Sequence, residues 1–168
     1  MSADHGAGAT PTAQPAHEVL LRPFVVSDLP AVLEIEQVSF PAPWKPEFFL
    51  SELNNPYARL AVAERTGQVI GYFCRWLVAD EVHVLDIAVH PAQRRRGVGK
   101  FLLQEILAEA RQNGACSVSL EVRVSNLPAL ALYQAFGFRQ VAFRRQYYKN
   151  GEDAFLMVCF LSDLANSE

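Results

Sequence analysis

A strand followed by a glycine turn and a helix constrains this chain most, and it runs from Asp86 to Lys100 as DIAVHPAQRRRGVGK. Apolar, mostly β-branched residues lead up to His90, and an amphipathic stretch follows over 100–111. Gly97 and Gly99 carry no Cβ, so the backbone of the turn can come close to a bound group. The start of the helix adds unpaired N–H groups and the positive end of its dipole, which favour phosphate.

Positive charge surrounds this turn, because residues 94–96 are all arginine and residue 100 is lysine. We interpret the segment as a cradle for the pyrophosphate of a large anionic cofactor. A surface turn with a basic helix start is an equal alternative on this segment alone. The dinucleotide-binding fingerprint is incomplete, since its third glycine is replaced by Leu102, and no Gly-Lys-Ser/Thr ending indicates a P-loop.

Length and composition indicate one soluble globular domain. The chain has 168 residues, of which 51% are hydrophobic and 20% charged, with a net charge of −3. This balance argues against a protein that coats nucleic acid or an anionic membrane. We expect a disordered tail over 1–17, the folded domain over 18–161 and a C-terminal tail over 162–168. The first residues lack the pattern of a secretory signal, so we expect a cytoplasmic protein.

The three cysteines are an odd number, are widely spaced and lie in apolar segments. This spacing favours buried free thiols over a disulfide framework or a metal site. No apolar run reaches the length of a membrane span.

Hydrophobic periodicity predicts a mixed α/β domain with hairpins at both ends and a strand–helix–strand unit in the middle. Ser27 is a candidate N-cap for the first helix, and Asn126 for a later short helix that Gly137 ends. The predicted strands are 18–24, 60–64, 69–78, 82–89, 117–124, 138–148 and 154–161, and the predicted helices are 29–36, 46–53, 100–111 and 127–136.

Two side chains are suited to acyl transfer from a thioester to an amine, which needs a base for the amine and a proton for the leaving thiolate. Glu121 lies in the polar row of an alternating strand and could act as general base. Tyr133 lies about two helical turns after Asn126, and a phenol with a pKa of about 10 can protonate a thiolate. A solvated strand residue and a core tyrosine are the alternative interpretations. Asn126 is first a helix cap, with a ligand contact as a second role.

The strand Ile87-Ala88-Val89 and the turn Arg94-x-x-Gly97-x-Gly99 resemble the acetyl-CoA signature of the GCN5-related N-acetyltransferases. Leu-Glu-Val-Arg-x-Ser-Asn over 120–126 and Ala-Leu-Tyr-x-x-x-Gly-Phe over 131–138 extend the likeness. Together with Tyr147-Tyr148 and the Phe40 to Trp44 loop, they resemble the bacterial ribosomal-protein S18 alanine N-acetyltransferases. The similarity covers roughly residues 18–161.

This resemblance implies a single acetyltransferase domain with a mixed sheet of about seven strands and about four helices, acetyl-CoA as cosubstrate and no metal. It implies that Glu121 accepts a proton and Tyr133 donates one, with the Val89 amide polarising the carbonyl. Arg94 stands where many members carry Gln, and both fit the superfamily signature. The implied acetyl-CoA contacts are Ile87, Ala88, Val89, Arg94, Arg95, Arg96, Gly97, Val98, Gly99, Lys100 and Asn126. Phe40, Trp44, Tyr147 and Tyr148 are candidate walls for the acceptor, with core and loop packing as the simpler interpretation.

The acceptor implied by the resemblance is the N-terminal alanine of ribosomal protein S18. Neutralising an α-amine at pH 7 costs about 1 kcal/mol and neutralising a lysine nearly 5, from pKa values of about 8 and 10.4. An α-amine is therefore the easier substrate for one glutamate. Direct attack is favoured because the catalytic motifs contain no cysteine. A protein lysine, a small-molecule amine and a non-catalytic CoA-binding module stay as alternatives.

Overall fold

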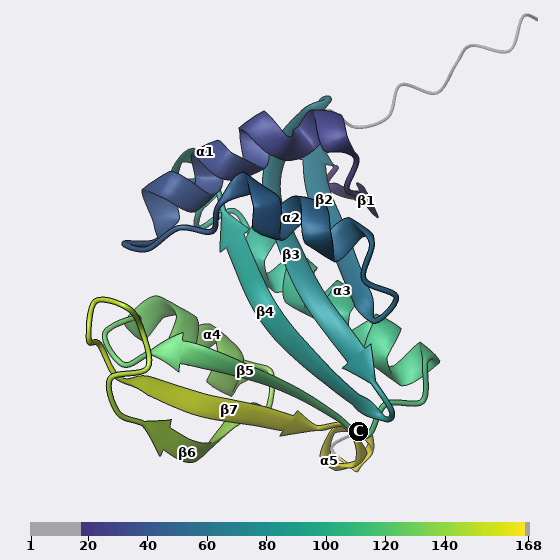
Figure 1. Ribbon diagram of the computed structural model, residues 1–168. Helices are drawn as coiled ribbons and strands as arrows, with labels where there is room; N and C mark the ends of the chain where they lie inside the picture. Colours follow the sequence, from purple (N-terminus) through teal and green to yellow (C-terminus); the bar gives the residue numbers. More distant parts are fainter. Residues whose placement is uncertain (1–17, 167–168) are drawn as a thin grey trace, which may run out of the picture.

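A seven-stranded mixed sheet with helices on both faces forms the molecule (Figure 1). The computed structural model describes residues 18–166, so the expected tail over 1–17 lies outside them. In chain order the elements are β1 (Leu20–Pro23), a 3-10 turn (Val26–Asp28), α1 (Leu29–Ser39), α2 (Pro46–Leu53), β2 (Ala58–Arg65), β3 (Gln68–Val78), β4 (Glu81–Val89), a second 3-10 turn (Pro91–Gln93), α3 (Val98–Gln112), β5 (Ser117–Arg123), α4 (Leu127–Ala135), β6 (Arg139–Arg144), β7 (Ala154–Phe160) and α5 (Leu161–Ala165). The predicted fold class and strand number are confirmed.

The strand order is β1-β2-β3-β4-β5-β7-β6, and among the strands of residues 18–166 only the central β4–β5 pair is parallel. That pairing is short, because it joins Glu81–Val84 to Ser117–Leu120 and then stops. Beyond it the two strands diverge, which divides the sheet into two parts (Figure 1). A bulge coincides with the divergence: Cys74 faces Asp86 while Arg75 faces Val84, so Leu85 is an extra residue in β4.

The bulge changes which residues of β4 face each side of the sheet. Before it, Val82 and Val84 point into the larger core between the sheet, α3 and α4. After it, Ile87 packs against that core, whereas Ala88 joins the smaller core under α1 and α2. A bulge adds one residue to a period of two, so the alternation inverts at that point.

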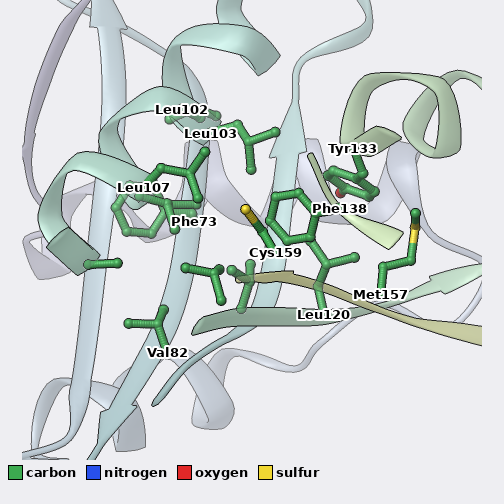
Figure 2. Packing of buried hydrophobic residues seen from close by; sticks show 14 of the residues in the cluster. Phe73, Val82, Leu102, Leu103, Leu107, Leu120, Tyr133, Phe138, Met157 and Cys159 are labelled. Atoms are coloured by element: carbon green, nitrogen blue, oxygen red, sulfur yellow. The ribbon is translucent and has the colours of Figure 1, made fainter. Parts of the chain in front are cut away.

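The larger core is built as the helical periodicity predicts. Figure 2 shows α3 side chains packing on Phe73 and the sheet, with Tyr133 and Phe138 beside Leu120. The apolar stripe of α3 is buried and consists of Leu102, Leu103, Ile106, Leu107 and Ala110. Burying such a stripe stabilises the domain by about 25 cal/mol for each Å² of apolar surface removed from water.

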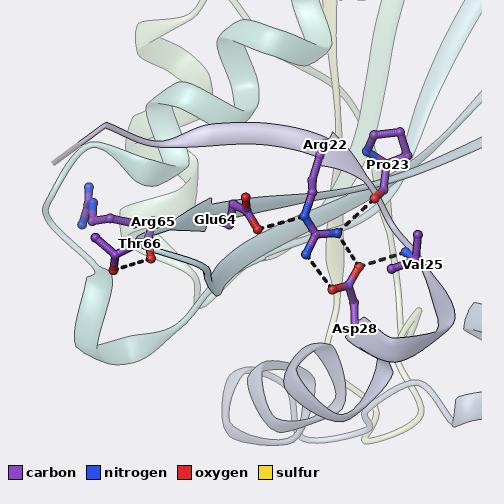
Figure 3. Close-up of polar contacts among 7 residues, drawn as sticks. All are labelled: Arg22, Pro23, Val25, Asp28, Glu64, Arg65 and Thr66. Atoms are coloured by element: carbon purple, nitrogen blue, oxygen red, sulfur yellow. Dashed lines mark hydrogen bonds and ion pairs between the residues drawn. The ribbon is translucent and has the colours of Figure 1, made fainter. Parts of the chain in front are cut away.

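A partly buried ion pair, between Arg22 and the buried Asp28, fixes the start of the domain (Figure 3). The Arg22 guanidinium donates to both Asp28 carboxylate oxygens at 2.8 Å and to Glu64 at 2.9 Å, which ties β1 to β2. Asp28 also accepts the Val25 N–H at 2.9 Å and is the N-cap of α1. The expected cap, Ser27, lies inside the preceding 3-10 turn instead, because Asp28 is the residue held by Arg22.

Three local expectations differ from the structure. Cys116 is exposed, although Cys74 and Cys159 are buried, because it lies at the surface where the chain enters β5. The strand expected over 138–148 ends at Arg144, since Gln146 has a φ of +50° and its N–H donates to Asp153 at 2.8 Å. Residues 161–165 form the short helix α5. No helix within residues 18–166 combines the length and apolar character needed to cross a bilayer.

Candidate active site

A cavity of about 200 Å³ opens where β4 and β5 separate. Its walls come from β4, β5, the N-cap and later part of α4, the end of α1 with the loop that follows it, and the turn between β6 and β7. The site residues expected from the sequence that line it are Phe40, Trp44, Ile87, Glu121, Asn126, Tyr133 and Tyr148. These residues are far apart in the chain, so the divergence of the strands is what brings them together.

Glu121 faces this cavity from β5, with 12% of its side chain exposed. Its Oε2 lies 3.0 Å from Nε2 of His83, and its Oε1 lies 3.7 Å from Nε of Arg144. Burial raises the pKa of Glu121, but the hydrogen bond from His83 and the nearby positive charges outweigh burial and lower the pKa below its ordinary value. The side chain is therefore a carboxylate at neutral pH, the form that accepts a proton.

Tyr133 reaches the same cavity from α4 and is almost fully buried. Its ring packs on Phe138 with centroids 5.7 Å apart. Burial raises the pKa of the phenol, with smaller contributions from Tyr148 and Asp86. Tyr133 is therefore protonated at neutral pH and able to donate.

Asn126 takes the first of the two roles considered for it, the helix cap, and the ligand contact stays a prediction. As the predicted N-cap of α4, its side chain accepts the Ala129 N–H at 3.3 Å, and it also lines the cavity.

The end of β4 turns two backbone amides away from β3, beside the cavity. The His90 N–H donates to the Ile70 carbonyl at 2.8 Å across the β3–β4 pair. In an antiparallel ladder the bonded positions alternate, so the amides of Ile87 and Val89 point away from β3. They face the side that β5 has left, which suits an extended ligand that pairs like a strand.

The glycine turn lies at the other end of this segment. Gly97 is the N-cap of α3 with a φ of +79°, and no atom lies within 4 Å of the position a Cβ would take. The Phe101 N–H donates to the Gly97 carbonyl and so makes the first hydrogen bond of the helix. The backbone amides of residues 98–100, before it, are therefore available to a ligand. With Arg95, Arg96 and Lys100 close in sequence, this open turn fits a diphosphate.

Arg94 has a more specific place than the sequence indicates. Its Nε donates to the Val89 carbonyl at 3.2 Å and its Nη2 to the Ser39 hydroxyl at 3.1 Å. It therefore links the glycine turn to β4 and to the end of α1. Ala88, Val89, residues 94–100 and Tyr147 are expected site residues that do not line the cavity.

Aromatic side chains form opposite walls of the cavity. The Trp44 ring packs on Phe49 with centroids 5.3 Å apart, and the Trp44 backbone N–H donates to the Glu36 carboxylate at 2.8 Å. On the other side, the Arg123 guanidinium lies 3.8 Å from the centre of the Tyr148 ring. Tyr147 is half exposed and meets Tyr148 edge to face at 5.0 Å.

Sequence reasoning missed a buried polar cluster at the cavity. The Tyr72 hydroxyl donates to Glu36 and lies 3.4 Å from Asp86, and both carboxyl groups line the cavity. Burial and then the proximity of Glu36 raise the pKa of Asp86 well above its ordinary value. Asp86 is therefore more readily protonated than an ordinary aspartate. An acidic residue within an apolar strand was the available signal, since such a residue is seldom buried without a partner.

No group of three or more His, Cys, Asp and Glu side chains within residues 18–166 is arranged to hold a metal ion.

Comparison with known proteins places this geometry in context. Residues 29–138 match the model of the acetyltransferase (GNAT) family. The ribosomal protein bS18 alanine N-acetyltransferase of Escherichia coli is 34% identical over 139 residues, which cover 81% of this chain and 93% of that protein. A Bacillus subtilis protein that carries the same name provisionally is 40% identical over 134 residues, or 79% of this chain and 89% of its own length. The crystal structure of the Escherichia coli enzyme superposes with a TM-score of 0.79 and 32% identity, over 86% of this chain and 94% of that one.

Proposed function

Because the chain belongs to the GNAT family of acetyl-CoA-dependent N-acetyltransferases, we propose that it acetylates the α-amine of a protein N-terminus, namely the N-terminal alanine of ribosomal protein S18. The names of the relatives support this acceptor, and the alignments with those relatives cover most of the chain. We also propose that residues 18–161 form the catalytic domain.

In this proposal Glu121 and Tyr133 have complementary roles. The Glu121 carboxylate takes a proton from the acceptor amine while the amine nitrogen forms a bond to the acetyl carbon. The carbon–sulfur bond breaks, and the leaving thiolate takes the phenolic proton of Tyr133. The opposite protonation states of the two side chains at neutral pH, ionised for Glu121 and neutral for Tyr133, support this assignment.

The orientation of the backbone at the end of β4 and the open glycine turn support a proposed way of holding acetyl-CoA. The amides of Ile87 and Val89 would pair with the pantetheine arm, and the Val89 amide would polarise the thioester carbonyl. The open turn at 94–100 would hold the pyrophosphate, with Asn126 as a further contact. When bound, acetyl-CoA supplies the activated acetyl group.

The acceptor would enter between the aromatic walls formed by Phe40 and Trp44 on one side and Tyr147 and Tyr148 on the other. This entrance leads to Glu121, which needs an amine that loses its proton readily. An α-amine meets that requirement better than a lysine does.

The single observation that carries the proposal is that Glu121 and Tyr133, from β5 and α4, line one cavity at the divergence of β4 and β5. Intact-mass analysis tests it. The protein is incubated with acetyl-CoA and an S18-type peptide that begins with alanine, the same peptide with a blocked N-terminus and an internal lysine, or a small amine. We expect one added acetyl group on the first peptide only. Acetylation of the lysine or the small amine alone would assign another acceptor. No added acetyl group on any of the three would indicate a CoA-binding module.

A further inference from the structure

His83 connects Glu121 to a hydroxyl on the same face of the sheet. His83 and Ser119 are register partners in the parallel β4–β5 pair, and Glu121 lies two residues further along β5. Nδ1 of His83 is 2.8 Å from the Ser119 hydroxyl, and Nε2 is 3.0 Å from Oε2 of Glu121. The imidazole thus lies between a hydroxyl and the carboxylate that faces the cavity.

Hydrogen-bonding capacity determines the tautomer of this imidazole. An ionised carboxylate can only accept, so the ring nitrogen facing Glu121 must carry the proton. In a neutral ring Nδ1 is then the acceptor, and the Ser119 hydroxyl can donate to it. Ser119 therefore stabilises the tautomer that donates to Glu121.

We propose that His83 is a positioning residue for the general base: it holds Oε2 of Glu121 through Nε2–H and leaves Oε1 directed at the amine. The proposal rests on the proposed function of Glu121. Oε1 has a looser neighbour, since the Arg144 side chain is 3.7 Å away and 47% exposed. The phenols of Tyr147 and Tyr148, on the turn before β7, are the other titratable groups facing Glu121.

The same contact makes the base sensitive to the charge of His83. A second proton, placed on Nδ1, turns the ring into an imidazolium and strengthens its hold on the carboxylate. A carboxylate stabilised in this way is a poorer proton acceptor. Imidazole side chains change charge between about pH 5 and 8, a range in which Glu121 is already ionised. Protonation of His83 should therefore lower activity, and this effect should be absent when the side chain at this position cannot titrate.

The test compares His83→Gln with the wild type, because glutamine keeps a donor for Glu121 but does not titrate. The kcat/KM of the variant is divided by that of the wild type, on one alanine peptide, from pH 8.5 to pH 5.5. The ionisation of the peptide amine cancels in this ratio. We expect this ratio to rise by about threefold or more as the pH falls. A change of about one unit in the pKa of the general base changes the rate of proton transfer by roughly that factor. A flat ratio with an active wild type would overturn the proposal and leave the proposed function intact. An inactive wild type would contradict the proposed function itself.

A spectroscopic measurement gives a second readout that needs no turnover. Nitrogen-15 correlation spectra of the wild-type protein above pH 8 should show His83 protonated at Nε2 and unprotonated at Nδ1. The opposite tautomer would overturn the proposal. Ser119→Ala should retain the fold and the Nε2–H tautomer that Glu121 requires, but Nδ1 should lose its hydrogen bond and its nitrogen-15 shift should change. An unchanged Nδ1 shift would remove Ser119 from the arrangement.

Discussion

Val84 and Leu120 are the last residues at which β4 and β5 pair, and the cavity begins directly beyond them. Glu121 is the next residue of β5, and the extra residue Leu85 follows Val84 in β4. The proposed proton acceptor and the Ile87 and Val89 amides that point away from β3 are therefore brought to the two sides of one gap.

Replacing Glu121 by glutamine should lower kcat by about 10²–10⁴-fold, because the amide cannot take the amine proton. Binding of acetyl-CoA, measured by calorimetry, should stay within about twofold, since the proposed contacts of acetyl-CoA are elsewhere. Glu34→Gln is the matched control, because this glutamate is 69% exposed on α1 and should retain full activity. Unchanged turnover in the Glu121 variant would refute the assigned base.

Tyr133→Phe should lower kcat by about 10²-fold while the protein stays folded, because only a hydroxyl is removed from a packed ring. Single-turnover kinetics would place the loss in the chemical step. Tyr57→Phe, at a half-exposed tyrosine after α2, should behave as wild type. Equal activity of the two variants would leave Tyr133 as a core residue.

Gly97→Ala and Gly67→Ala form a matched pair, since the two glycines have φ values of +79° and +78° and open space at the Cβ position. Each substitution should lower the free energy of unfolding by about 1 kcal/mol through backbone strain. Only Gly97→Ala should weaken acetyl-CoA binding, because Gly67 lies in the β2–β3 turn. Equal affinities in calorimetry would show that the turn at 94–100 does not approach the diphosphate.

Asp28→Asn should lower the free energy of unfolding by about 1–3 kcal/mol at pH 7, because the Arg22 guanidinium loses one of its two charged partners and keeps only Glu64. The hydrogen bond from Arg22 lowers the pKa of Asp28 despite its burial. A carboxyl group whose pKa is lowered on folding stabilises the protein above its unfolded pKa, and this contribution is lost as pH falls through the folded pKa. The difference between variant and wild type in urea unfolding should therefore shrink below about pH 4.

The exposed pair between Arg139 and Asp163, at 2.7 Å, is the control for that measurement. Asp163→Asn should change the free energy of unfolding by less than about 1 kcal/mol, since solvent screens exposed pairs. A loss as large as that of Asp28→Asn would show that burial does not distinguish the two pairs.

Local patterns in the sequence determined the parts of this protein that depend on neighbouring residues. The stripe of α3, the cap at Asn126 and the glycine turn were predictable because helix periodicity, capping and positive φ act over a few positions. The alternation around Glu121 placed it on the polar row of its strand for the same reason.

Only the tertiary structure decided where β4 and β5 stop pairing and which face of β4 follows the bulge at Leu85. It also paired His83 with Ser119, which is 36 positions away in the chain, and thereby placed the imidazole beside Glu121. The physical reason is that strand register and the end of a ladder depend on packing between distant segments, which no window of neighbouring residues contains.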